Sequence, residues 1–190
     1  MIDYGLITRQ VAAMQKHYGY ADPREILTDL GISLLEMSMG KNDDAIKGFI
    51  LKNNRCETVG INTDLSEEAQ NKVLFHEIGH HECGHLSRIR SGTLHDTSFG
   101  YRSDTTQLSR FENEANFFAS DYILDTEDTL EAIHEYDLAS AARLLRVPIE
   151  FLDYKLRLLH QTGRLSHYYD CLSVQSDCMR KMRLSDPLYE

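Results

Sequence analysis

The segment that most constrains the fold of this chain is His76-Glu77-Ile78-Gly79-His80, which follows the signal for the start of a helix. The Ser66 hydroxyl can cap the first backbone amides, and the acidic Glu67 and Glu68 favour the positive end of a helix dipole. We therefore predict a helix from Ser66 to about residue 85. Residues four apart on a helix lie on one face, about one turn apart, so the two histidines could bind one metal ion together.

Zinc is the ion that two such imidazoles favour, because zinc binds imidazole nitrogen readily and, in catalytic sites, keeps one coordination position for water. Glu77 lies roughly 100° around the helix from His76, which would place its carboxylate beside that water and not on the metal. Zinc lowers the pKa of bound water to about 7, and a neighbouring carboxylate can accept the proton as the water attacks a carbonyl. The alternative is a polar helix face that matches this short motif by chance, although Leu74 and Ile78 supply a separate apolar stripe.

A zinc site of this kind needs a third protein ligand, and the residues after the motif exclude one class. A metzincin would have glycine at position 83 and histidine at position 86, where this chain has Cys83 and Leu86. Cys83 could itself be an inhibitory or redox-sensitive ligand, but a cysteine of this kind more often packs as a small apolar residue. A glutamate on a later helix, as in thermolysin-like enzymes, is the other way to complete the site.

Residues 108–124 have the pattern of such a later helix. Its apolar residues can face the core, namely Phe111, Ala115, Phe118 and Ala119. In that orientation Glu114 would point to the metal, and Glu112, two residues away on a different face, is the second choice. His85 and His95 are weaker candidates. Asp121 could orient a zinc-bound imidazole, or could equally well accept an N–H bond from elsewhere.

The remaining patterns predict an α+β fold, with a small, mostly antiparallel sheet packed on a zincin-like helical layer. A short helix is predicted from Pro23 to Leu30, with Asp22 as its N-cap and Gly31 just past its end. Strands are predicted at residues 32–37, 46–51 and 56–61, with a hairpin turn at Asn53-Asn54. The edge of this sheet could accept a substrate segment in extended form. Residues 87–107 form an unusually long polar loop, which in compact domains is often functional.

We expect three parts along the chain. Residues 1–125 form a zincin-like metallopeptidase domain, and residues 126–165 form a helical part packed on it. Short helices near 127–135, 138–145 and 149–159 make that second part resemble a helix-turn-helix unit. Residues 166–190 are a tail without a recognisable element.

Composition bears on location and partners. The first residues, MIDYGLITRQ, lack the apolar run of a signal peptide, and no stretch approaches the roughly 18 apolar residues that span a bilayer. Four cysteines without CxxC spacing favour free thiols, so we expect a cytoplasmic protein. The net charge of −10 disfavours binding to nucleic acid and favours a protein partner with a basic surface.

The order of these motifs resembles the ImmA/IrrE family of gluzincin-like metallopeptidases over roughly residues 20–160. The features that carry the resemblance are Asp22-Pro23 with Leu30-Gly31-Ile32, Gly48-Phe49, Ile61-Asn62, the histidine motif, and Glu114-Ala115-Asn116 with Phe118-Ala119. The resemblance implies that His76, His80 and Glu114 bind one zinc ion per chain. It also implies that Glu77 is the general base.

The same resemblance implies a biological role. Such proteins, often encoded by mobile elements, cleave or inactivate helix-turn-helix repressors of the Cro/CI type and so derepress genes. We therefore expect a zinc endopeptidase whose protein substrate is such a repressor. Two alternatives are a non-catalytic antirepressor that binds the repressor stoichiometrically, and a DNA-binding regulator that uses the unit at residues 138–159.

Overall fold

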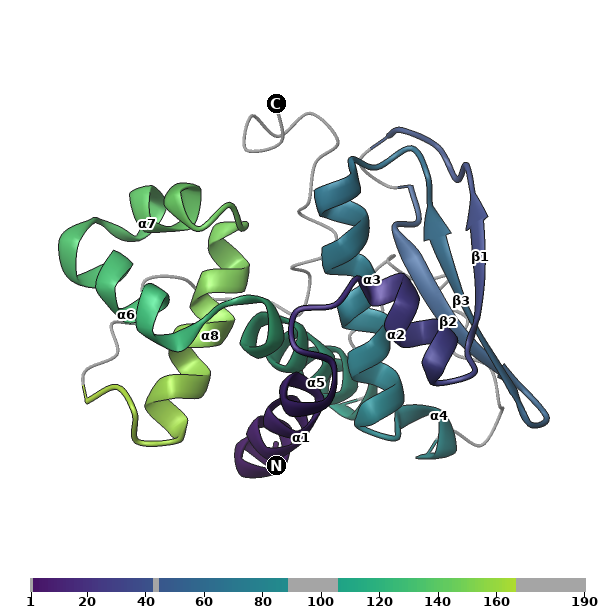
Figure 1. Ribbon diagram of the computed structural model, residues 1–190, viewed down its shortest axis with the longest axis horizontal. Helices are drawn as coiled ribbons and strands as arrows, with labels where there is room; N and C mark the ends of the chain where they lie inside the picture. The colour runs from purple at the N-terminus through teal and green to yellow at the C-terminus, as the bar shows by residue number, and fades with distance from the viewer. Residues whose placement is uncertain (1, 43–44, 89–105, 167–190) are drawn as a thin grey trace.

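The computed structural model of the chain describes residues 2–42, 45–88 and 106–166. Within these ranges it contains eight helices and a three-stranded sheet (Figure 1), which confirms the α+β fold. In chain order the elements are α1 (Tyr4–Tyr18), α2 (Pro23–Asp29), β1 (Ser33–Met37), β2 (Gly48–Asn53), β3 (Cys56–Asn62), α3 (Glu67–Glu82), α4 (His85–Arg88), α5 (Thr106–Ile123), α6 (Thr126–Glu135), α7 (Leu138–Leu144) and α8 (Ile149–Gln161).

The sheet is mixed, with the strand order β1-β3-β2. The β2–β3 hairpin is antiparallel and turns at Asn54, whose φ of 55° is in the left-handed region that asparagine tolerates. Because the chain reverses between β1 and β2 and again in the hairpin, β3 runs parallel to β1. One of the two pairings is therefore parallel, where the sequence predicted a mostly antiparallel sheet.

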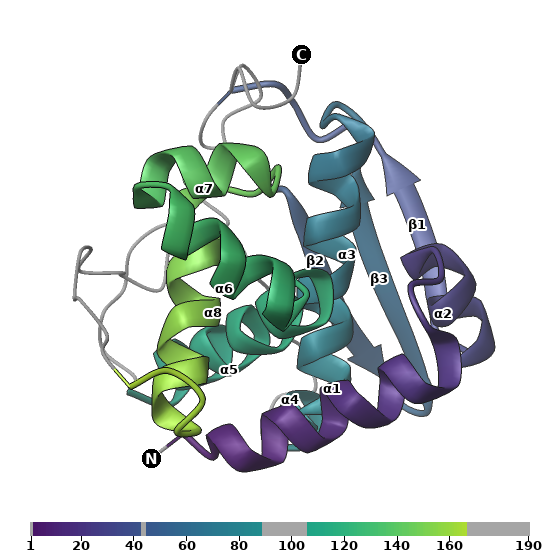
Figure 2. The same ribbon diagram turned by 60° about the vertical axis from the view of Figure 1, so that its left-hand side comes forward.

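Helix α3 crosses the sheet closely, and a glycine on β2 makes this approach possible. Ser66 caps α3 through a hydrogen bond from the backbone N–H of Ala69, as the sequence predicted. A Cβ atom on Gly48 would lie 2.5 Å from Cγ1 of Val73 on α3 and 3.0 Å from the backbone oxygen of Gly60 on β3. No side chain fits there, so Gly48 brings β2 against the middle of α3 (Figure 2).

Helix α5 packs on the other side of α3, and a second glycine sets how near it comes. A Cβ atom on Gly79 would lie 3.0 Å from the backbone oxygen of Ala115 and 3.2 Å from Cβ of Phe118. The apolar residues predicted to face the core from α5 do so, since each is completely buried: Phe111, Ala115, Phe118 and Ala119. The close crossing brings the first half of α5 beside the histidine motif of α3 (Figures 1 and 2).

The last three helices form a group beside α5, and α8 is the one that packs on α5 most directly. Helix α8 is buried along residues 151–156 and again at Leu158 and Leu159. Its buried Lys155 lies 2.6 Å from Oδ1 of Asp121, which takes Asp121 away from the histidines that it was considered to orient. The predicted tail lies almost entirely outside the described residues, as does most of the 87–107 loop. Among the described residues, no helix is both long and apolar enough to cross a membrane.

Candidate metal centre

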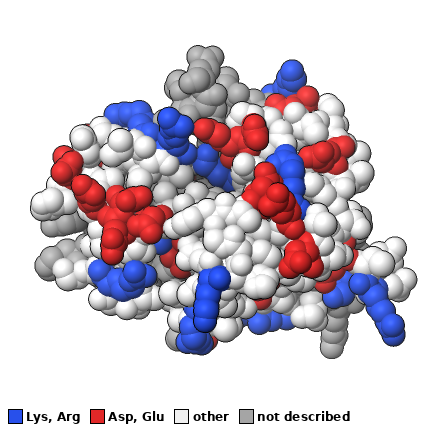
Figure 3. All heavy atoms as spheres, in the orientation of Figure 1, with Lys and Arg blue, Asp and Glu red and all other residues white. Residues whose placement is uncertain are grey.

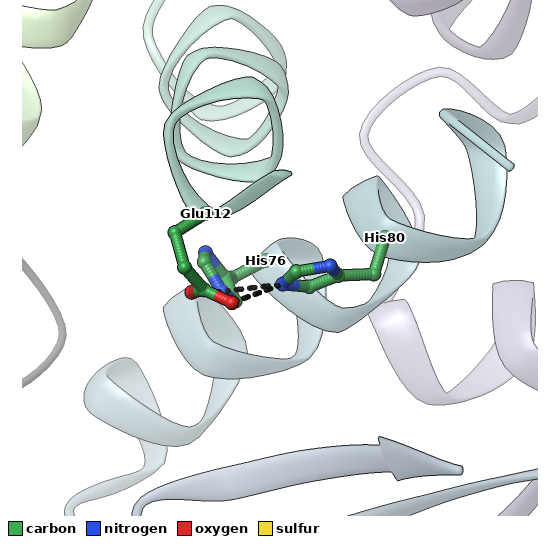
Figure 4. Close-up of side chains that lie close together, drawn as sticks. All are labelled: His76, His80 and Glu112. Carbon is green, nitrogen blue, oxygen red and sulfur yellow. Dashed lines mark hydrogen bonds and ion pairs between the residues drawn. The ribbon is translucent and has the colours of Figure 1, made fainter. Parts of the chain in front are cut away.

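Three side chains from two helices converge on one point: His76 and His80 from α3 and Glu112 from α5 (Figure 4). Nε2 of His76 lies 3.2 Å from Oε2 of Glu112, and Nε2 of His80 lies 3.4 Å from Oε1. The two imidazole Nε2 atoms are 3.0 Å apart. One atom of each residue thus lies within 4.8 Å of the others, which is the arrangement that a single metal ion requires.

The structure places Glu112, not Glu114, beside the histidines, whereas the sequence predicted Glu114 as the third ligand. Glu114 lies on another face of α5, where its Oε2 is 3.0 Å from Nε2 of His85 and its Oε1 is 3.3 Å from Nε of Arg110. Residues two apart on a helix point roughly 200° apart, so the two glutamates cannot serve the same point. Because α5 is buried on most of its faces, its apolar pattern did not fix which glutamate faces α3.

His76 is oriented by a chain of hydrogen bonds that passes from α5 to Tyr154 on α8 and back to α5. Its Nδ1 lies 2.9 Å from Oδ1 of Asn116, one helical turn after Glu112 on α5. The Asn116 amide donates to the Tyr154 hydroxyl at 3.3 Å, and this hydroxyl donates to Oδ1 of Asn113 at 2.9 Å. These directions fix the Asn116 amide with its oxygen toward His76, so the His76 proton lies on Nδ1 and Nε2 keeps a lone pair.

His80 is held from the opposite side by His85, a residue of the short helix α4. The two Nδ1 atoms are 2.9 Å apart, and the other nitrogen of His85 reaches Glu114. The His85 ring is completely buried and stacks on Phe111, with ring centroids 4.3 Å apart. From the sequence, His85 is a weak candidate for a metal ligand, and the structure places it behind His80, on the side away from the cluster.

The electrostatics of the cluster favour the forms that bind metal ions. Burial lowers the pKa of His76, and the nearby Glu112 carboxylate, which favours the protonated ring, offsets this only in part. Burial alone would raise the pKa of Glu112, but the charges and hydrogen bonds of His80 and His76 outweigh it and hold that pKa well below its usual range. A neutral imidazole and an ionised carboxylate are the states in which these groups coordinate a cation.

These donors fit zinc. Two imidazole nitrogens and one carboxylate form a ligand set of catalytic zinc sites, with a fourth position left for water. The Nε2 lone pair of His76 points at the other two members of the cluster. A lone pair can bind a cation but cannot donate to a hydrogen-bond acceptor. His76, His80 and Glu112 are therefore the residues that would hold the ion.

Glu77, the predicted general base, is a buried residue of α3 that faces the sheet strand β2. Its Oε1 lies 3.4 Å from the point that a Cβ atom on Gly48 would occupy. The Glu77 carboxylate therefore lies against β2 at Gly48. Glu77 is not one of the three residues of the His76–His80–Glu112 cluster, so its role as the general base stays a prediction.

Residues 27–157, more than half of the chain, match the family model of the IrrE N-terminal-like domain, a peptidase family. The chain belongs to this family. The match confirms the resemblance stated from the motifs and assigns the chain to a metallopeptidase-like family. No curated protein matches the chain. The matched region of this IrrE-like chain contains the whole histidine–glutamate cluster and extends through Tyr154, so both of the hydrogen-bond chains behind the histidines lie within it.

Of the other residues considered for this IrrE-like site, Cys83 packs as a buried residue, with its Sγ 3.8 Å from Oε1 of Gln10 on α1. Burial raises the pKa of the Cys83 thiol to about 12, which disfavours the thiolate that binds metals. His95 lies outside the described residues.

Sequence reasoning missed the supporting residues Asn116 and Tyr154. A signal for Asn116 was present, because Glu112 and Asn116 are four residues apart and so share one face of α5, like the histidines on α3. Two polar residues at this spacing in an otherwise apolar helix indicate a face that meets a polar site. Tyr154 gave no such signal, since its role depends on how α8 packs on α5.

Proposed function

We propose that this protein is a zinc-dependent endopeptidase that cleaves, and so inactivates, a helix-turn-helix repressor. The observation that carries the proposal is the convergence of His76, His80 and Glu112, with Glu77 next to the first histidine in the chain. Membership of a peptidase family supports the reaction class.

In the proposed reaction, His76, His80 and Glu112 hold the ion. Bound zinc supplies a Lewis acid that polarises a peptide carbonyl and acidifies water to a pKa of about 7. The Glu77 carboxylate accepts the proton of the attacking water and later returns it to the nitrogen of the leaving amine. Glu77 is buried between α3 and β2, so its carboxylate is shielded from bulk water, and in such a site its electrostatic effect on the reaction is larger than in solvent.

The sheet supports a substrate that binds in extended form. Strand β2 is at one side of the three-stranded order and, among the described residues, pairs with β3 through one edge only. The same strand carries Gly48, which lies against Glu77. A substrate segment that adds to the other edge of β2 by main-chain hydrogen bonds would pass near the general base.

Charge supports a basic protein partner. The chain carries a net charge of −10, and acidic side chains lie among basic ones over the face of the molecule in Figure 3. A DNA-binding repressor carries a basic surface for phosphate contacts, and attraction between opposite charges speeds the encounter of two proteins. We therefore propose a repressor substrate in the cytoplasm, encoded beside this protein on a mobile element.

Burial of α8 argues against a direct DNA-binding role. In a helix-turn-helix DNA-binding protein the second helix enters the major groove and presents its side chains to the bases. Here α8, the second helix of that unit, instead packs most of its side chains into the core. Purified protein should accordingly bind no duplex DNA even at low salt, where phosphate contacts are strongest.

The test of the peptidase proposal is Glu77→Gln, assayed with purified repressor and zinc. We expect zinc binding and the melting temperature to be retained and cleavage to fall by roughly 100-fold or more, because general base catalysis contributes about 10²–10⁴-fold. The matched control is Glu68→Gln, the same change on an exposed residue of α3, which should cleave like the wild type.

The rival role is stoichiometric binding of the repressor without cleavage. If Glu77→Gln releases repressor control in cells as well as the wild type does, binding is sufficient and the peptidase proposal is wrong. If the repressor stays intact after incubation with the zinc-loaded wild-type protein, the peptidase proposal is also wrong.

A further inference from the structure

Behind His80 lies a buried arrangement that the proposed reaction does not use. The His85 ring bridges His80 and Glu114, with contacts of 2.9 Å between the two Nδ1 atoms and 3.0 Å from its Nε2 to Oε2 of Glu114. The ring has no exposed surface and is held by stacking on Phe111. Such a histidine is costly to bury unless both of its nitrogens are hydrogen-bonded, and here both are.

The carboxylate at the end of this arrangement determines where the protons lie. Glu114 is paired with Arg110 at 3.3 Å and lies 3.9 Å from Nη1 of Arg88. An ionised carboxylate only accepts hydrogen bonds, so Nε2 of His85 must carry a proton. The ring is completely buried, and its one carboxylate partner is already paired with Arg110 and close to Arg88, so a second proton would leave a buried positive charge without a counter-ion of its own; the ring is therefore neutral and has only that one proton. Its Nδ1 is therefore an acceptor, and the proton between the two rings belongs to Nδ1 of His80.

We propose that His85 and Glu114 are a positioning pair that holds His80 in the tautomer with its proton on Nδ1. Nε2 of His80 then keeps its lone pair directed at His76 and Glu112. In the opposite tautomer Nε2 would carry a hydrogen and could not coordinate a cation. This inference rests on the proposed zinc site. In it, Glu114 acts on His80 through His85 and does not bind the metal itself.

Two substitutions of His85 can distinguish its hydrogen bond to His80 from its packing. Phenylalanine at position 85 would keep the stacking on Phe111 and the burial, but it would leave Nδ1 of His80 without a partner. Asparagine at that position offers an amide oxygen in place of the His85 Nδ1, the acceptor that Asn116 already offers to His76. The two substitutions therefore separate hydrogen bonding from packing.

The experiment compares His85→Phe and His85→Asn in the full chain by two measurements. The first is the tautomer of His80 in the zinc-free protein, from long-range proton–nitrogen NMR correlations of the imidazole rings. The second is the zinc dissociation constant, from competition with a chromogenic chelator. His81→Phe is the matched control, because His81 is next to His80 in the chain but binds Glu57 on the sheet at 2.5 Å.

We expect His80 to carry its proton on Nδ1 in the wild type and in His85→Asn. In His85→Phe we expect a mixture of tautomers and a zinc affinity about 10–100-fold lower, the usual effect of losing such a partner. His85→Asn should recover most of that affinity, and His81→Phe should match the wild type. The melting temperature of each zinc-free variant reports whether the fold is intact.

Equal losses in His85→Phe and His85→Asn, or a wild-type His80 protonated on Nε2, would overturn the positioning role. A wild type with the expected tautomer that binds no zinc would instead contradict the proposed function and leave the tautomer assignment supported. The two failures are therefore distinguishable.

Discussion

His76 and His80 are one turn apart on the same helix, yet different regions of the molecule hold them. Behind His76 is a neutral chain formed by an amide and a phenol, which runs through Asn116 on α5 to Tyr154 on α8. Behind His80 is an imidazole followed by a carboxylate, formed by His85 on α4 and Glu114 on α5. The motif on α3 thus supplies the metal-facing atoms, and three other helices determine which tautomer each ring adopts.

The difference between the two supports is one of charge. A carboxylate at the end of a hydrogen-bond chain makes the ligand imidazole more basic, whereas a neutral amide mainly fixes its orientation. The support behind His80, formed by His85 and Glu114, should therefore contribute more to zinc affinity. The support behind His76, formed by Asn116 and Tyr154, should depend more on how α8 packs. Substitutions in the cluster and in the two supports test this difference in zinc affinity.

The largest effect is expected from Glu112→Ala. Loss of a ligand should reduce zinc affinity by more than the roughly 10–100-fold that loss of an orienting partner costs. Glu114→Ala is the natural comparison, since it removes the same group two residues away and would act on His80 through His85. Competition with a chromogenic chelator measures both dissociation constants.

The ranking of these two variants decides the identity of the third ligand. If Glu114→Ala loses more zinc than Glu112→Ala, the choice made from the sequence was right and the cluster of His76, His80 and Glu112 is not the zinc site.

Asn116→Leu should have the next largest effect. It removes the acceptor of the His76 Nδ1 proton while keeping a similar volume, so we expect zinc affinity to fall by about 10-fold, the lower end of the range for such partners. Combined with His85→Phe, losses that add on a logarithmic scale would show that the two supports act independently, although the rings that they hold are 3.0 Å apart. A double variant no weaker than His85→Phe alone would mean that the two supports are not independent.

Much of the local structure could be predicted from the sequence. The cap at Ser66, the short helix between Asp22 and Gly31, and the hairpin at Asn54 each depend on the chemistry of a few neighbouring residues. The paired histidines are equally local, since one helical turn separates them whatever the rest of the chain does.

What could not be predicted depends on contacts between distant segments. The rotation of α5 about its axis is set by α3, α1 and α8 together, so its apolar residues alone did not distinguish Glu112 from Glu114. The parallel pairing of β1 with β3 likewise follows from the path of the connecting chain, not from any residue in β1.

The smallest effect is expected from Tyr154→Phe, which tests whether α8 influences the metal site. The Tyr154 hydroxyl fixes the orientation of the Asn116 amide, and without it the amide can rotate and present its NH₂ group to His76. One hydrogen bond contributes about 0.5–1.5 kcal/mol net, so zinc affinity should fall by roughly 2–13-fold. Tyr122→Phe is the control, because that buried hydroxyl bonds the backbone oxygen of Gly19, away from the site. Both variants should lose similar thermal stability, but only Tyr154→Phe should lose zinc affinity; equal affinities would show that α8 supports the fold without affecting the metal centre.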